Sequence, residues 1–167
     1  VDFIEDDQLR LMFLTCHPVL SVPSRVALTL RLLGGLTTPE VARALLADER
    51  AVAQRIVRAK RSLTTAEAPF EVPTGADRQA RLAAVLEVVY LIFTEGYAAT
   101  TGDDWTRPAL CREAIRLSRL LTDLAPHEPE AHGLLALLQL QASRLPARTT
   151  GSGEPILLGD QDRTRCR

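Results

Sequence analysis

Apolar residues recur every three or four positions along most of the chain, which is the spacing of helices with one buried face. The period-two alternation that indicates strands is rare. Glycine and proline collect at the breaks between the periodic stretches, where they end helices and form turns. The pattern therefore predicts an all-α protein.

Four helices are predicted before residue 65. The first begins at Asp6 and ends at Pro18, and a pair of glycines ends the second. Thr37 and Glu40 have the spacing of a capping box, in which each side chain bonds the backbone N–H of the other residue at the start of the third helix. These helices are expected at residues 6–17, 24–33, 38–46 and 49–63.

The helical pattern fails over residues 66–76, where Pro69, Pro73 and Gly75 interrupt it. We interpret this segment as a linker between a first domain, residues 1–65, and a helical extension, residues 77–167. The last two helices of the extension are expected to form an antiparallel pair, and the final twenty residues are predicted to be irregular. Its helices are expected at residues 77–94, 107–124 and 128–145.

Composition limits the class of protein. The 167 residues are 46% hydrophobic, 4% aromatic and 25% charged, which is enough apolar material for a buried core. No apolar run reaches the roughly 18 residues that a membrane helix needs. The acidic start is no signal peptide, and a chain that begins with Val1 is expected to be part of a longer protein. Three distant cysteines, Cys16, Cys111 and Cys166, fit a reducing cytoplasm and exclude a disulfide framework.

Charge is unevenly distributed along the chain, although 20 Lys and Arg against 21 Asp and Glu give a net charge of −1. Residues 49–63 hold five basic residues and only one acid, Glu49, a local charge of +4. Residues 66–167 hold 11 basic and 14 acidic residues, a charge of −3. This distribution argues against general coating of nucleic acid and favours one local basic helix.

Residues 36–63 have the order of a helix-turn-helix: a short capped helix, a brief turn and a longer basic helix. Asp48 is the predicted N-cap of the second of these helices. The turn at Leu46, Ala47 and Asp48 has no glycine, although such turns often contain one. The predicted inner faces are Val41, Ala42 and Leu45 on the first helix and Val52, Ile56, Ala59 and Leu63 on the second.

The opposite face of the longer helix carries arginines and a glutamine. Arginine pairs with guanine edges and glutamine with adenine edges in the major groove of DNA, and arginines near a helix end often hold phosphates. The pattern favours a DNA-recognition helix, and the alternative is a surface helix with a solvated basic face. The residues on this face are Arg50, Ala51, Gln54, Arg55, Arg58 and Arg61.

Three motifs of the first domain carry a resemblance to a known family. They are Arg25-Val26-Ala27-Leu28-x-Leu30-Arg31, Leu36-Thr37-x-x-Glu40-Val41-Ala42 and Val52-x-x-Arg55-x-x-Arg58-Ala59. They resemble the fourth conserved region of bacterial sigma factors of the extracytoplasmic-function type. This resemblance implies a four-helix domain that reads the promoter −35 element and docks on the flap of core RNA polymerase. It implies DNA contact by Gln54, Arg55 and Arg58, to which we add Arg50, Arg61 and Thr38.

Four segments of the extension carry a second resemblance, and they are 90–97, 110–117, 132–137 and 160–163. They resemble the C-terminal extension of one sigma group, which is helical, tetratricopeptide-like further on and implicated in regulation. The resemblance implies a regulatory protein partner, no cofactor and no enzymatic activity. The promoter-melting domain of such factors has no counterpart in these residues.

Histidines offer a weaker candidate site. His127 and His132 are five residues apart, whereas a zincin helix needs two histidines four apart. We therefore expect His127 near a helix N-terminus and His132 in a helix–helix contact. His17, before Pro18, is interpreted as structural.

Carboxylates and aromatics around residue 100 form another candidate. Asp103, Asp104 and Glu95 could hold a cation or act as an acid–base pair, which makes a small enzyme a remote alternative. The sequence favours turns and caps there, since neither calcium-loop glycines nor a nucleophile–histidine pair is present. The aromatics suggest a ligand pocket or, as we favour, core packing; they are Tyr90, Phe93, Tyr97 and Trp105.

Two further expectations concern single features. Cys111 is expected to be buried as a small apolar residue, and Cys166 to lie near an exposed end. The acidic extension motivates a second functional hypothesis, a protein-interaction module in which the extension masks the basic helix.

Overall fold

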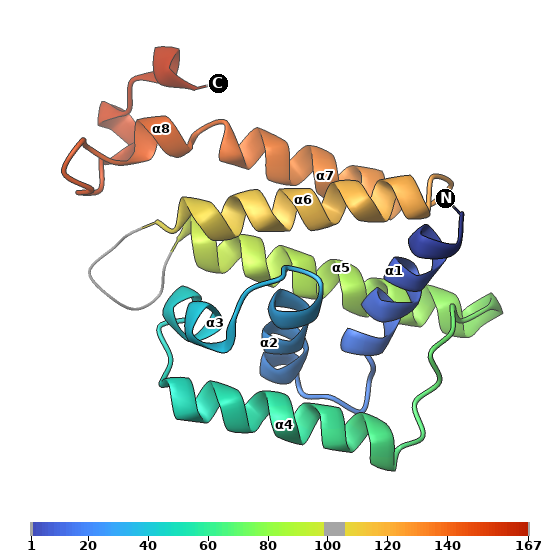
Figure 1. Ribbon diagram of the computed structural model, residues 1–167. Coiled ribbons are helices and arrows are strands. Elements are labelled where there is room, and N and C mark those ends of the chain that lie inside the picture. Colours follow the sequence, from blue (N-terminus) through green and yellow to red (C-terminus); the bar gives the residue numbers. More distant parts are fainter. Residues whose placement is uncertain (1, 99–105, 167) are drawn as a thin grey trace.

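The computed structural model describes the backbone of residues 2–98 and 106–166, with side chains from Asp7 onward in these ranges. The described chain is all-α, as the apolar pattern predicts (Figure 1). Its α-helices are α1 (Asp2–Thr15), α2 (Val22–Leu32), α3 (Thr38–Ala44), α4 (Glu49–Thr65), α5 (Gly75–Tyr97), α6 (Pro108–Leu124), α7 (Pro129–Ala142) and α8 (Leu145–Arg148). Two 3-10 turns follow, η1 (Leu158–Asp160) and η2 (Arg163–Arg165).

Helix α2 lies at the centre of the molecule. Four consecutive residues, 27–30, are buried in it, and successive side chains on a helix point about 100° apart. A helix that faces a core on one side cannot bury four positions in a row, so the middle of α2 is covered all round, while Leu32 near its end is 37% exposed. It packs on α3 and α4 on one side and on α1 and α5 on the other (Figure 1).

The extension forms a layer of three antiparallel helices, α5, α6 and α7, above α2 (Figure 1). The predicted pairing of α6 with α7 is confirmed. Helices α5 and α6 approach each other closely at Gly96, where an added Cβ would lie 2.8 Å from the carbonyl oxygen of Arg107 and from the backbone N of Cys111. The Arg107 N–H also donates to the Gly96 carbonyl at 2.6 Å. A side chain at position 96 would therefore push the two helices apart.

Several helix ends differ from the prediction. Helix α1 begins at Asp2 rather than Asp6, and α3 ends at Ala44 rather than Leu46. The chain cannot continue as a helix past Ala44, because Leu46 adopts a left-handed φ of 46°. The predicted last helix, 128–145, divides into α7 and the separate turn α8.

One hydrophobic core crosses the predicted linker. Residues 66–74 connect α4 to α5 outside any helix. The cluster of buried apolar side chains nevertheless contains Phe13, Leu28 and Val52 together with Val88 and Leu117. The residues before and after this segment therefore share one core. The division into independent domains at residues 66–76 stays a prediction.

Buried cysteines belong to this core. Burial raises the pKa of both Cys16 and Cys111 to about 11, so both thiols stay protonated at neutral pH. The predicted burial of Cys111 and exposure of Cys166 are confirmed. Across the described residues, no helix has both the length and the apolar character that crossing a membrane requires.

The shared core generates a prediction about truncation. A chain cut after residue 73 loses α5, so the side of α2 that α5 covers becomes exposed to water. We expect this fragment to unfold at a lower temperature than the full chain and with a broader transition, as followed by circular dichroism. A fragment with the same midpoint as the full chain would show that residues 1–65 fold independently.

Candidate nucleic-acid interface

The capping box that starts α3 is present as predicted. The Thr37 hydroxyl accepts a hydrogen bond from the Glu40 N–H at 3.4 Å, and the Glu40 carboxylate accepts from the Thr37 N–H at 2.7 Å. The Thr37 N–H and the Thr37 hydroxyl, which also donates to the Glu40 carboxylate at 2.8 Å, lower the pKa of the Glu40 carboxyl. A lowered pKa means that the charged, cap-forming state is fully present at neutral pH and is lost as the pH falls through the folded-state pKa.

The turn between α3 and α4 closes without glycine. Leu46 takes the left-handed conformation that glycine usually occupies, and its side chain is 49% exposed. The Ala47 N–H donates to the Ala42 carbonyl at 2.9 Å and so returns the chain toward α3. Asp48 then caps α4, because its carboxylate accepts from the Ala51 N–H at 3.0 Å. This confirms the predicted N-cap.

The inner face of α4 packs as the periodicity predicts. Its buried residues are Val52, Ile56, Ala59 and Leu63. They lie against α2 and α3, which fixes the rotation of α4 about its own axis. Once the inner face is buried, the residues between these positions must face outward.

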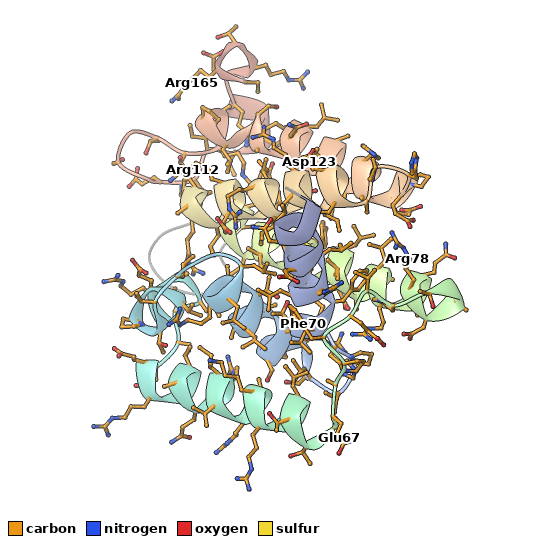
Figure 2. The ribbon with its side chains drawn as sticks, turned by 45° about the vertical axis from the view of Figure 1, so that its right-hand side comes forward. Glu67, Phe70, Arg78, Arg112, Asp123 and Arg165 are labelled. Carbon is orange, nitrogen blue, oxygen red and sulfur yellow. The ribbon has the colours of Figure 1, made fainter. Side chains whose placement is uncertain are left out.

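The outward side carries the predicted basic face, which we define as Arg50, Gln54, Arg55, Arg58 and Arg61. Arg55 is half-buried and the other four are exposed. Arg58 donates to the Gln54 side-chain oxygen at 3.5 Å. Arg50, Arg55 and Arg61 form no hydrogen bond or ion pair with the described residues. Nitrogen-tipped side chains along α4 point away from the rest of the molecule (Figure 2).

A shallow groove of about 480 Å³ lies beside the C-terminal half of α4. Arg58 and Arg61 line it together with the hydroxyls of Ser62 and Thr65, and Val19 lies at its edge. Guanidinium and hydroxyl groups are among the side-chain groups that bind DNA phosphates. Ser62 and Thr65 are absent from the predicted contacts, although each lies four residues after one of these arginines, on the same side of the helix.

The extension leaves the basic face open. Helices α5, α6 and α7 lie on the opposite side of α2 from α4 (Figure 1). Among the described residues nothing covers the exposed arginines of α4. This arrangement argues against the hypothesis that the extension masks the basic helix.

The predicted helix–helix contact of His132 is wrong. His132 is exposed on the first turn of α7, and its Nε2 lies 2.9 Å from the Pro126 carbonyl oxygen in the preceding turn. His127 is exposed just before α7, as expected for a position near a helix N-terminus. The half-buried His17 accepts a hydrogen bond from the Val19 N–H at 3.2 Å. Within the described ranges, no three His, Cys, Asp or Glu residues gather in a way that could hold a metal.

The candidate cluster near residue 100 is only partly described. Asp103, Asp104 and Trp105 lie outside the described residues. Glu95 forms an ion pair with Arg107.

The aromatic stretch gives a mixed result. Phe93 is buried and stacks on Tyr97 with ring centroids 5.5 Å apart, which confirms core packing there. The Arg148 guanidinium lies 3.9 Å from the centroid of the Tyr97 ring. Tyr90 is 47% exposed, so its predicted core position is wrong.

A helix-turn-helix with a packed inner stripe and an open basic face is the architecture of a DNA-reading domain. Residues 10–63 match the family described as sigma-70, region 4. The chain is thus a sigma-70 region 4 domain followed by a second region. Residues 81–167 match a family of unknown function, DUF6596, and the chain belongs to this family.

A similar protein is known from Rhizobium meliloti (strain 1021). That uncharacterized protein is 51% identical over 158 residues, which cover 95% of this chain and 37% of the relative. The chain therefore spans little more than a third of the relative's length. No solved structure matches this chain.

The cap of α4 generates a stability prediction. We expect Asp48→Ala to lower the free energy of unfolding by about 1 kcal/mol, because the Ala51 N–H loses its acceptor. Asp48→Asn is the matched control, since an amide oxygen can still accept this hydrogen bond. Chemical denaturation of both variants measures the effect. Equal stability of Asp48→Ala and the parent chain would contradict a stabilising cap.

Proposed function

We propose that this chain is the promoter-recognition part of a sigma factor of the extracytoplasmic-function type. The observation that carries the proposal is the open basic face of α4, together with the match to sigma-70 region 4. In this proposal α4 enters the major groove of the −35 element. The chain then makes and breaks no covalent bond and needs no cofactor.

Base reading is assigned to the middle of α4. Gln54, Arg55 and Arg58 are spaced so that one groove can receive all three side chains. The contact between Arg58 and Gln54 restricts both side chains before DNA binds. Ala51, where such factors often have threonine, removes one contact, and Arg50 supplies another.

Contacts with the DNA backbone are assigned to residues on either side of these three base-reading side chains. Arg50 lies in the first turn of α4, while Arg61 lies in the groove with Ser62 and Thr65. Thr38, half-buried at the start of α3, is the remaining proposed contact. Such phosphate contacts set the register of the helix and make binding dependent on salt.

The proposed partners follow from the sigma-factor assignment. They are promoter DNA and the flap of core RNA polymerase, which places the protein in the cytoplasm. We also propose that the extension continues as tetratricopeptide-like helix pairs and receives a regulatory protein. The antiparallel pairing of α6 with α7 supports this.

The test compares variants on a selected DNA sequence. Duplexes that bind the full chain are selected from a random library, and affinities are measured by fluorescence anisotropy. We expect Arg55→Ala and Arg58→Ala each to weaken binding by about 1–3 kcal/mol on the selected duplex, with little change on a scrambled one. Lys60→Ala is the control, because Lys60 is an exposed cation of α4 outside the basic face.

Three outcomes would contradict parts of this proposal. Equal losses on selected and scrambled duplexes would show that the two arginines contact phosphates only. If Lys60→Ala lowers affinity for the selected duplex as much as Arg55→Ala does, the effect comes from positive charge in general and not from base reading. Failure of the full chain to select any sequence would overturn base reading by α4.

A further inference from the structure

Three arginines of the extension bind the ends of three helices in the first half. The last carbonyl groups of a helix have no partner within it and must find donors elsewhere. Arg81 of α5 donates to the Phe13 carbonyl in the last turn of α1 at 3.0 Å. Arg116 of α6 donates to the Leu33 carbonyl, just after α2, at 2.7 Å. The third arginine, Arg107, donates to the Ala44 carbonyl at the end of α3 at 3.0 Å.

The Arg107 contact lies beside the helix-turn-helix turn. Ala44 is the last residue of α3, and α4 begins at Glu49. Between them is Leu46, whose left-handed φ of 46° strains the turn. Helix α3 has only seven residues, too few to be stable by itself. Its N-terminal end is held by the Thr37 capping box, and Arg107 holds its C-terminal end.

Arg107 itself is held firmly in place. Its guanidinium forms an ion pair with Glu95, and its side chain is only 11% exposed. Its backbone N–H donates to the carbonyl of Gly96, where α5 and α6 approach each other closely. Contacts from α5 therefore hold both the backbone and the guanidinium of Arg107, and these contacts orient its donors toward α3.

Apolar packing between α3 and α6 is incomplete at this place. An open pocket of about 410 Å³ lies between the two helices and is lined by residues of both, among them Ala44 and Leu110, together with Arg107. A hollow interface has fewer side-chain contacts to hold α3 in position. The polar contact from Arg107 to Ala44 is thus a main link between α3 and the extension.

We propose that Glu95 and Arg107 form a clamp that positions the helix-turn-helix for DNA without touching DNA. This inference rests on the proposed function of α4. The clamp holds the C-terminal end of α3. The position of this end determines where the turn begins and therefore where α4 starts. When the clamp is lost, the turn samples more conformations, and DNA binding must order it again. A part of the DUF6596 region thereby acquires a role in DNA reading.

The test uses Arg107→Met in the full chain, a change that removes the donors and keeps the length of the side chain. We expect affinity for the selected duplex to fall about tenfold, since a charged hydrogen bond contributes on the order of that factor or more. The slope of log affinity against log salt concentration should stay unchanged, because no phosphate contact is lost. The matched control is Arg116→Met, which removes the carbonyl contact at Leu33, away from the turn, and should change affinity by less than about twofold.

A second readout is independent of DNA. Amide hydrogen exchange should accelerate in Arg107→Met at Leu45, Leu46 and Ala47, whose N–H groups bond back to α3. Exchange at Ile56 and Ala59, within α4, should not change. If Arg107→Met does not fold, Glu95→Gln is expected to give a smaller change in the same direction.

The inference fails if Arg107→Met leaves affinity unchanged. It also fails if the salt slope falls by about one, which would show a direct phosphate contact. Faster amide hydrogen exchange throughout α1–α4 would show that Arg107 stabilises the whole first half and not the turn in particular. This result would likewise overturn the clamp. A parent chain that binds no duplex would instead overturn the proposed function, and exchange at the turn would still decide whether the clamp exists.

Discussion

The ends of α1, α2 and α3 depend on arginines that come from the other half of the chain. Helix-terminal carbonyls have no partner within their own helix, and a buried one that stays unpaired costs about 1–3 kcal/mol. Arg81, Arg107 and Arg116 satisfy these carbonyls with a side chain that can donate several hydrogen bonds at once. Because α5 also packs on α2, the first half depends on the extension for part of its core and for the ends of these three helices.

Two sets of arginines have different roles in this structure. Arg81, Arg107 and Arg116 of the extension reach the first half, bind backbone carbonyls and carboxylates, and so stabilise the fold. Those on the basic face of α4 are left for an external anion. The chain has 19 arginines and one lysine among its 20 basic residues, and its net charge of −1 conceals this division. Charge counted over the whole chain therefore says little about either role.

Local signals in the sequence predicted local structure well. The Thr37 capping box, the Asp48 cap and the inner face of α4 depend on residues within one or two helical turns. Predictions that depended on distant neighbours fared worse. Thr29 is polar, and an apolar pattern does not predict its burial, yet it is 2% exposed because helices pack on both sides of α2. Tyr90 and His132 were expected in packed positions and are exposed.

The helices, their caps and the basic face of α4 follow from local sequence, because periodicity and capping act over a few residues. The position of the extension on the far side of α2, where its described residues leave this face open, follows from tertiary packing alone. The same holds for the hydrogen bond from Arg107 to Ala44, a contact between residues 63 positions apart. No local pattern encodes such a contact, since it arises from the close approach of α5 and α6 at Gly96 and from the way these helices lie against α3.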